Sequence, residues 1–291
     1  EFYENAESEE QDEKANKHSA VRQVGVLSSR YLRLLLNDRQ RLMLVLLQAP
    51  LLSFLISIVA NGKQFEAFGI TQSLLFALSC SAFWIGTLNA IQEICKERVI
   101  LRREYMTGLH LIPYIISKFL VLGLLCLIES IFLTAVFAIG VGYPETGVII
   151  NPVIELFITT FLTALAASGM GLFASAMFKN PDRAMTVAPI LLMPQILFSG
   201  LLFKLEGVTK YISWFAVCRW SMEGFGTTAD LNSLTSTATI NGQTMEIERE
   251  AEAFFEYTGG HIVKAWLILL AFVIVFALIS VLILRNIRKG E

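Results

Sequence analysis

Long apolar runs alternate with short polar segments along most of the chain. Six runs are long enough to cross the roughly 30 Å of hydrocarbon in a bilayer, which takes about 20 helical residues. To within a few residues at each end, they are 42–60, 70–92, 119–142, 156–178, 184–203 and 265–284. The pattern therefore predicts an all-α membrane protein with six transmembrane helices.

The first 41 residues lack such a run. Residues 1–19 are strongly acidic and are expected to form a solvated cytoplasmic linker, and the start at Glu1 rather than at methionine favours a piece of a longer polypeptide. In residues 20–41, apolar side chains recur at helical spacing on one face, and arginines gather on another. The apolar positions are Val24, Leu27, Tyr31, Leu34 and Leu35, and the basic ones are Arg22, Arg30 and Arg33. This pattern predicts an amphipathic helix that lies on the membrane surface or, alternatively, packs on a neighbouring domain.

Residues 93–110, which we call the charged elbow, separate the second and third predicted spans. The charged side chains of the elbow are Glu93, Lys96, Glu97, Arg98, Arg102, Arg103 and Glu104. Other basic residues at span ends on the same side are Arg39, Arg41, Lys179, Arg183, Arg285, Arg288 and Lys289. The turns on the other side hold only Lys63. Because Lys and Arg are retained on the cytoplasmic side, both termini and the elbow are predicted to be cytoplasmic.

The segment 204–261 is the longest connection on the outer side. Its first part, 208–226, is apolar and aromatic, and the remainder up to Tyr257 is rich in Ser, Thr, Asn and acidic residues. An aromatic segment too short to span a bilayer tends to lie at the interface or to dip back into the membrane. We expect a re-entrant or interfacial helical hairpin under a small extracellular lid, with a simple loop of buried aromatic residues as the alternative.

Composition supports the membrane assignment and narrows the function. Hydrophobic residues make up 55% of the 291 residues and charged residues only 16%, with a formal net charge of −2. This charge offers no basic excess for binding nucleic acid. The four cysteines show no metal-ligand or disulfide spacing, and the chain contains no nucleotide-binding or hydrolase motif. The chain itself is therefore not expected to be an enzyme, and its energy must come from another domain or from a gradient.

Few ionisable residues interrupt the predicted spans. Glu129 lies well inside the third span, so it is either a proton or ion site or a structural hydrogen-bond partner. Lys118, Glu155 and His261 lie at span ends, from which they could reach the interface. Small residues of the fourth span, including Gly169 and Gly171, allow close helix packing within the protomer or, alternatively, at a dimer seam.

The elbow and the outer segment carry a family resemblance. The motif Glu97-Arg98-x-x-x-x-Arg103-Glu104-Tyr105-x-x-Gly108 leads into Pro113-Tyr114-x-x-x-Lys118. Further on stand Phe198-Ser199-Gly200-Leu201-Leu202, then Trp214, Arg219-Trp220 and Glu223. In this order and spacing, the chain resembles the membrane domain of the G subfamily of ABC transporters.

The resemblance implies that residues 42–291 form a six-span ABC-2 type domain that works as a dimer. ATP and magnesium would bind a nucleotide-binding ATPase domain, encoded upstream or on a partner subunit. The elbow would be the coupling helix that docks on this ATPase, and a pair of leucines would close the substrate cavity toward the outside. The implied coupling residues are Glu97, Arg98, Arg103, Glu104 and Gly108; the gate residues are Leu201 and Leu202; and the cavity candidates are Ile85, Pro189, Met193 and Ile196.

Together these observations lead to a principal hypothesis and two alternatives. The principal one is an ATP-driven exporter that moves an apolar or amphipathic compound, such as a lipid, lipid-linked glycan or drug-like molecule, by alternating access. Pro189 and Pro194 would make the fifth span either a mobile pore helix or a static kinked one. The family's paired outer-loop cysteines are missing and no Asn-x-Ser/Thr acceptor occurs, which favours a bacterial inner membrane. The alternatives are a secondary transporter that uses Glu129 and a scaffold that transports nothing.

Overall fold

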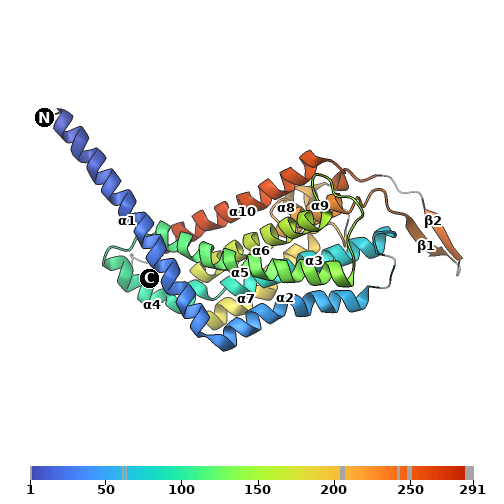
Figure 1. Ribbon diagram of the computed structural model, residues 1–291, viewed down its shortest axis with the longest axis horizontal. Coiled ribbons are helices and arrows are strands. Elements are labelled where there is room, and N and C mark those ends of the chain that lie inside the picture. The colour runs from blue at the N-terminus through green and yellow to red at the C-terminus, as the bar shows by residue number, and fades with distance from the viewer. Residues whose placement is uncertain are drawn as a thin grey trace.

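The computed structural model describes residues 2–60, 62, 64–203, 207–240, 243–247 and 251–285, with the side chains of 2–19, 237–240 and 243–247 excepted. These residues form an elongated bundle of helices with a small β-hairpin at one end (Figure 1). The elements are α1 (Phe2–Asn37), α2 (Arg39–Val59), α3 (Phe68–Ala90), α4 (Glu93–Met106), α5 (Leu111–Gly140), α6 (Pro152–Met177), α7 (Pro181–Leu197), α8 (Val208–Ser213), α9 (Val217–Thr228), β1 (Ser236–Ile240), β2 (Gln243–Ile247), the 3₁₀ helix η1 (Ala253–Phe255) and α10 (Gly259–Arg285). The expected all-helical bundle is confirmed, and the antiparallel β1–β2 hairpin is an addition to it.

Five helical stretches in the described part of the chain are long and apolar enough to cross a membrane. They are α2, α3 with the adjoining α4, α5, α6 and α10. The predicted fifth span, 184–203, corresponds to α7, which has 17 residues and already ends at Leu197. Two internal prolines each remove a backbone N–H donor from α7, and the chain turns at Gly200, where φ is 88°. The helix is therefore shorter than its apolar run.

Close packing of α3 against α6 forms the centre of the bundle. A Cβ atom on Gly86 would lie 2.0 Å from the backbone oxygen of Ala164, and one on Gly171 would lie 2.8 Å from the backbone oxygen of Thr87. The Ser168 hydroxyl bridges the two helices by donating to the Gly86 carbonyl at 3.1 Å. The small residues of the fourth predicted span are thus used for packing within this chain.

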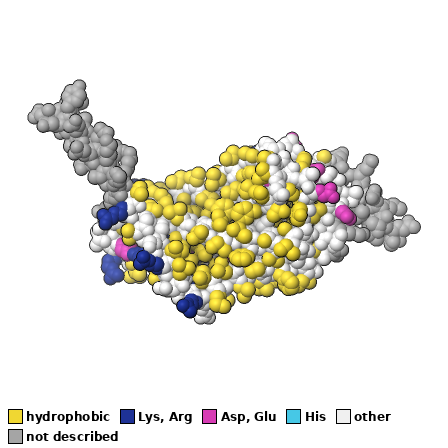
Figure 2. Space-filling model, in the orientation of Figure 1, with side chains coloured by type: hydrophobic (Ala, Val, Ile, Leu, Met, Phe, Trp, Pro, Cys, Tyr) yellow, Lys and Arg dark blue, Asp and Glu magenta, His cyan; other side chains and the backbone are white. Residues whose placement is uncertain are grey.

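The two ends of the bundle differ in charge. Figure 1 places α4 and the emerging α1 at one end, and the β1–β2 hairpin at the other. Figure 2 shows a broad band of apolar side chains between them, with Lys and Arg side chains at the α4 end and acidic side chains toward the hairpin end. Of the basic residues counted above, Lys63, Arg288 and Lys289 lie outside the described residues. Charge and apolar surface are therefore segregated along the bundle axis.

Helix α1 differs from the sequence-based expectation in two respects. It begins at Phe2, so the acidic residues expected in a linker belong to this helix, and Glu, Gln, Lys and Ala there are all good helix formers. Its apolar face packs inside the protein, where Leu27, Tyr31 and Leu35 are buried in the same cluster as Leu122 of α5. These three side chains therefore pack on the helical bundle itself, which neither the membrane-surface expectation nor the neighbouring-domain alternative had specified.

The described residues of the outer segment form α8, α9, the β1–β2 hairpin and η1, and the segment ends in the first turn of α10. All of α9 is buried, including Trp220 and Phe225, whereas Trp214 and Phe215 just before it are exposed. The Thr235 carbonyl accepts a hydrogen bond from the Phe68 amide at 2.9 Å, which ties the base of the hairpin to the start of α3. The aromatic residues therefore divide between the bundle interior and its surface.

Candidate functional site

The charged elbow forms α4 and the turn that follows it. Gly108 comes two residues after the helix end, with a φ of 105° that favours glycine. This turn leads directly into α5, which begins at Leu111, eight residues before the predicted span. The elbow is thus a rigid helix joined to α5 by a tight turn.

Two carboxylates on the inner face of α4 bind a buried lysine. The Lys118 ammonium lies 2.9 Å from a Glu97 carboxylate oxygen and 3.6 Å from Glu93, and its side chain is only 2% exposed. It also lies 3.7 Å from the centre of the Tyr31 ring. The expectation that Lys118 reaches toward the interface is wrong, because its ammonium is buried and the two carboxylates neutralise its charge inside the protein. The buried charges link α4, α5 and α1.

The same face of α4 contacts α2 and α1 through arginines. Arg41 of α2 donates a hydrogen bond to the Glu93 carboxylate, and Arg30 of α1 donates to Glu104 at 2.5 Å. The hydrogen bond to Glu104 raises the pKa of the Arg30 guanidinium, so Arg30 stays charged at physiological pH. Burial, followed by the charge of Glu93, raises the pKa of Tyr31 well above its usual value and keeps the phenol neutral.

Arg98 connects α4 to the end of α6. Its guanidinium donates to the carbonyl oxygens of Ala176 at 3.0 Å and Phe178 at 2.9 Å. Carbonyls at a helix C-terminus lack intrahelical partners and carry partial negative charge, so a cation there satisfies both needs. Arg98 therefore links any displacement of α4 directly to the C-terminal end of α6.

The outer face of α4 forms no such link to the other described helices. Its exposed side chains are Lys96, Val99, Ile100, Arg102, Arg103 and Met106. Val99 is 84% exposed, although α4 lies at the end of the bundle beyond the main apolar band. Within the described residues, Arg103 makes no side-chain hydrogen bond or ion pair. Of the four charged residues predicted to form the coupling contact, only Arg103 thus faces outward.

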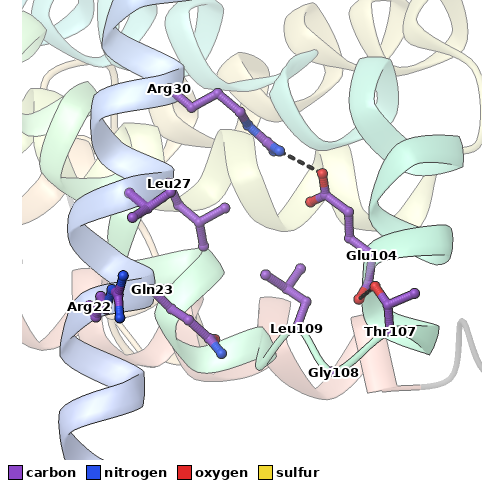
Figure 3. A pocket seen from close by; sticks show the side chains of 9 residues that line it. Arg22, Gln23, Leu27, Arg30, Glu104, Thr107, Gly108 and Leu109 are labelled. Carbon is purple, nitrogen blue, oxygen red and sulfur yellow. Dashed lines mark hydrogen bonds and ion pairs between the residues drawn. The ribbon is translucent and has the colours of Figure 1, made fainter.

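A groove of about 400 Å³ separates α1 from the end of the elbow. Figure 3 shows Gln23 and Leu27 of α1 pointing toward Leu109, with the Arg30–Glu104 ion pair across the top of the view. Gly108 lies at the opposite edge, and no atom lies within 4 Å of the position that a Cβ there would take. The groove therefore adds an open, mixed polar and apolar surface beside the outer face of α4.

Glu129 has partners on two other helices. Its carboxylate accepts hydrogen bonds from the side-chain amides of Gln48, at 2.7 Å, and Asn89. The Gln48 amide also donates to the Asn89 oxygen at 3.2 Å. These bonds support the structural role considered for Glu129, because they join α2, α3 and α5 in the middle of the bundle.

Glu155 does not reach toward the interface, as its position at a span end suggested. It is fully buried and accepts hydrogen bonds from the backbone amides of Val148, Ile149 and Ile150. The three donors satisfy the carboxylate and hold the turn between α5 and α6.

The predicted gate and cavity residues fall on different surfaces. Leu202 and Met193 are exposed, as is Pro189, and Leu201 and Ile196 are half-buried. Ile85, in contrast, is 1% exposed and packs in the protomer core with Leu133 and Met222. Ile85 therefore cannot line an open face of this chain. The partly exposed side of α3 carries Cys80, Ser81, Trp84 and Leu88 instead.

Sequence reasoning missed Arg30, Arg41 and Lys118 as members of the elbow network. Their partners lie 74, 52 and 21 to 25 positions away, so local patterns could not pair them. A lysine at the start of an apolar run, one helix after two glutamates, was the available signal. In the described part of the chain, no group of three or more His, Cys, Asp or Glu residues could hold a metal ion.

Comparison with known proteins gives the class of this fold and site. Residues 22–227, more than half of the chain, match the family described as ABC-2 type transporter. The chain belongs to this family, and it is a membrane domain with transmembrane helices.

Particular relatives refine the assignment. The ABC transporter ATP-binding/permease protein Rv1747 of Mycobacterium tuberculosis is 29% identical over 227 residues, covering 74% of this chain and 26% of the relative. ABC transporter G family member 4 of Arabidopsis thaliana is 26% identical over 228 residues, covering 74% and 38%. Protein white of Ceratitis capitata is 22% identical over 182 residues, covering 60% and 26%. The G-subfamily resemblance is confirmed, and the chain spans well under half the length of these relatives.

Proposed function

We propose that this chain is the membrane-spanning part of an ATP-driven exporter that moves an apolar or amphipathic compound by alternating access. The observation that carries the proposal is the two-faced α4. Its inner face is bound to α1, α2, α5 and α6 through Glu93, Glu97, Arg98 and Glu104, and its outer face is exposed among the residues that the structure describes. A helix so arranged can transmit a displacement from a partner domain bound on its outer face to the helices bound on its inner face.

The proposed partner of the outer face of α4 is a nucleotide-binding ATPase domain, which binds ATP and magnesium. It belongs either to the same polypeptide or to a separate subunit, and the printed name of the mycobacterial relative combines ATP-binding and permease functions in one protein. We propose that this domain docks on Arg103, Val99 and Met106 and on the neighbouring groove. The basic side chains there favour an acidic, partly apolar partner surface.

The proposed topology has six spans, with α7 as the fifth, and cytoplasmic N- and C-termini. A 17-residue helix rises about 25 Å, close to the hydrocarbon thickness of a bilayer. The basic side chains gathered at the α4 end support a cytoplasmic location for that end. A bacterial inner membrane remains the proposed location.

The substrate path is proposed to lie where α7 meets a second copy of the chain or a homologous half. Ile190, Met193 and Leu197 form an exposed apolar stripe on α7, at helical spacing. Such a lining suits an apolar or amphipathic ligand. ATP binding would close the ATPase domains, push on α4 and tilt α2 and α7 until Leu201 and Leu202 part.

The experiment uses the full-length protein with its ATPase domain, reconstituted in vesicles. Replacing both Arg103 by Glu and Val99 by Asp should leave the protein folded but lower ATP-driven transport about tenfold or more, because docking is weakened. Ile139, exposed at the other end, gives the matched control Ile139→Asn, which should transport normally. Normal transport by the docking-face variant would overturn the assignment of α4.

Replacing Glu104 by Gln tests the inner link separately. We expect ATP hydrolysis to continue while transport falls, because the Arg30–Glu104 pair no longer joins α4 to α1. Flux that depends on pH but not on ATP would favour a secondary transporter, and no flux under any condition would favour a scaffold. The hydrogen bonds of Glu129 argue for neither alternative.

A further inference from the structure

A charged cluster at the end of the bundle opposite α4 joins three segments around one buried carboxylate. Glu223 of α9 lies 3.0 Å from the His261 imidazole and 3.6 Å from the Lys264 ammonium, both on α10. Arg219, one turn earlier on α9, lies 4.0 Å from the second Glu223 oxygen. The cluster thus sets one carboxylate among three basic side chains, of which His261 is the titratable one near neutral pH.

His261 also holds the segment that leads into α10. Its Nε2 atom lies 3.2 Å from the Phe254 backbone oxygen, in addition to its contact with Glu223. Both neighbours are oxygen acceptors, so Nε2 must carry a proton for either contact to be favourable. The ring therefore fastens residues 253–258 to α9 through a single N–H group.

Protonation decides how firmly this N–H group is held. A neutral imidazole carries one ring proton, which can move to Nδ1 and leave Nε2 as an acceptor that faces two oxygens. A protonated imidazole carries hydrogens on both nitrogens, and its positive charge strengthens the bond to a carboxylate. Acid therefore fixes the donor in place and adds an ion pair.

We propose that His261 is a pH-sensitive latch that holds residues 251–258 against α9 more tightly at mildly acidic pH than at alkaline pH. Phe255 anchors the same segment, because its buried ring packs directly on Gly226 of α9. A Cβ on Gly226 would lie only 2.1 Å from a carbon of this ring. The latch thus tightens a segment that is already docked, and it is independent of the proposed transport function.

The charge state of Glu223 also affects the latch. Burial raises the pKa of Glu223, and the nearby charges of His261, Lys264 and Arg219 oppose this rise. The carboxylate must be ionised for the latch to gain from a charged imidazole. Measurements near pH 6 and near pH 8 bracket the range in which an ordinary imidazole changes charge.

The test is hydrogen exchange of the backbone amides in 251–258, measured on the full chain in lipid nanodiscs. After correction for intrinsic exchange rates, protection in the wild type should be about fivefold to tenfold higher near pH 6 than near pH 8. His261→Gln, which can donate a hydrogen bond but cannot become charged, should show less than about a twofold difference. An unchanged pH effect in His261→Gln, or no pH effect in the wild type, would overturn the proposal.

Two further variants keep the test decisive if His261→Gln does not fold. His261→Lys stays charged over the whole range, so protection should be high and independent of pH. Glu223→Gln removes the carboxylate charge and should abolish most of the acid-dependent gain. A wild-type pH profile in either variant would contradict the latch.

Discussion

Lys118 offers the sharpest test of the elbow network, because its charge is buried and depends on α4. Its ammonium contacts Glu97 at 2.9 Å and Glu93 at 3.6 Å, and the side chain is 2% exposed. Methionine has a similar length and no charge, so Lys118→Met removes the cation while filling most of its volume. The two carboxylates then lose their shared partner.

The expected cost follows from the burial of these groups. With an effective dielectric constant of about 20, two charges 2.9 Å apart attract by about 6 kcal/mol, and the loss of hydration offsets much of this. Breaking a buried ion pair on one side costs about 3–5 kcal/mol. Arg41 still neutralises Glu93, so we expect the lower end, about 3 kcal/mol, or a melting temperature about 6–12 °C lower.

The assay is thermal unfolding of the purified chain in detergent, followed by tryptophan fluorescence. The matched control is Lys96→Met, an exposed lysine on the same elbow, which should change stability by less than about 0.5 kcal/mol. Adding Glu97→Gln to Lys118→Met should restore part of the loss, because one uncompensated charge disappears. If Lys118→Met melts with the wild type and Lys96→Met, the buried network does not stabilise the elbow.

Two further substitutions test the connections of the central helices. Gly86→Ala should destabilise the chain by about 1–3 kcal/mol, since its Cβ would lie 2.0 Å from the Ala164 backbone oxygen. The control is Gly123→Ala, whose Cβ would have its closest contact at 3.6 Å. Equal melting temperatures of the two variants would contradict the close packing of α3 against α6. Arg98→Ala should lower stability by about 1.5–3 kcal/mol, because the carbonyls of Ala176 and Phe178 lose a charged donor; a melting temperature unchanged from the wild type would show that this link is not needed.

Hydropathy alone could predict most of the bundle. A helix needs about 20 apolar residues to cross the hydrocarbon layer of a bilayer. Apolar runs of this length can be read from the sequence for α2, α3, α5, α6 and α10. The start of α5 was harder to predict from the sequence, because a lysine normally marks the end of an apolar run. Lys118 is neutralised inside the protein, so the helix continues past it to Leu111.

The orientation of each helix could not be predicted in the same way. A span that is apolar on all sides has no periodicity to separate its core face from its outer face. Ile85 and Trp84 are neighbours that both lie within the apolar run, yet Ile85 is buried and Trp84 is partly exposed. Likewise, the charges of the elbow could be recognised, but which of them face inward depends on partners such as Arg30, 74 positions away.

The proposed function depends on contact between the outer face of α4 and an ATPase domain. The most direct measurement places a photo-crosslinking amino acid at Val99 in the full-length protein and identifies the crosslinked peptides by mass spectrometry. Val99 is 84% exposed, and Ile139, which is 87% exposed at the opposite end, is the control position. We expect crosslinks from position 99 to the nucleotide-binding domain and none from position 139. Crosslinks from position 99 only to lipid, or equal crosslinking from both positions, would contradict the proposed contact.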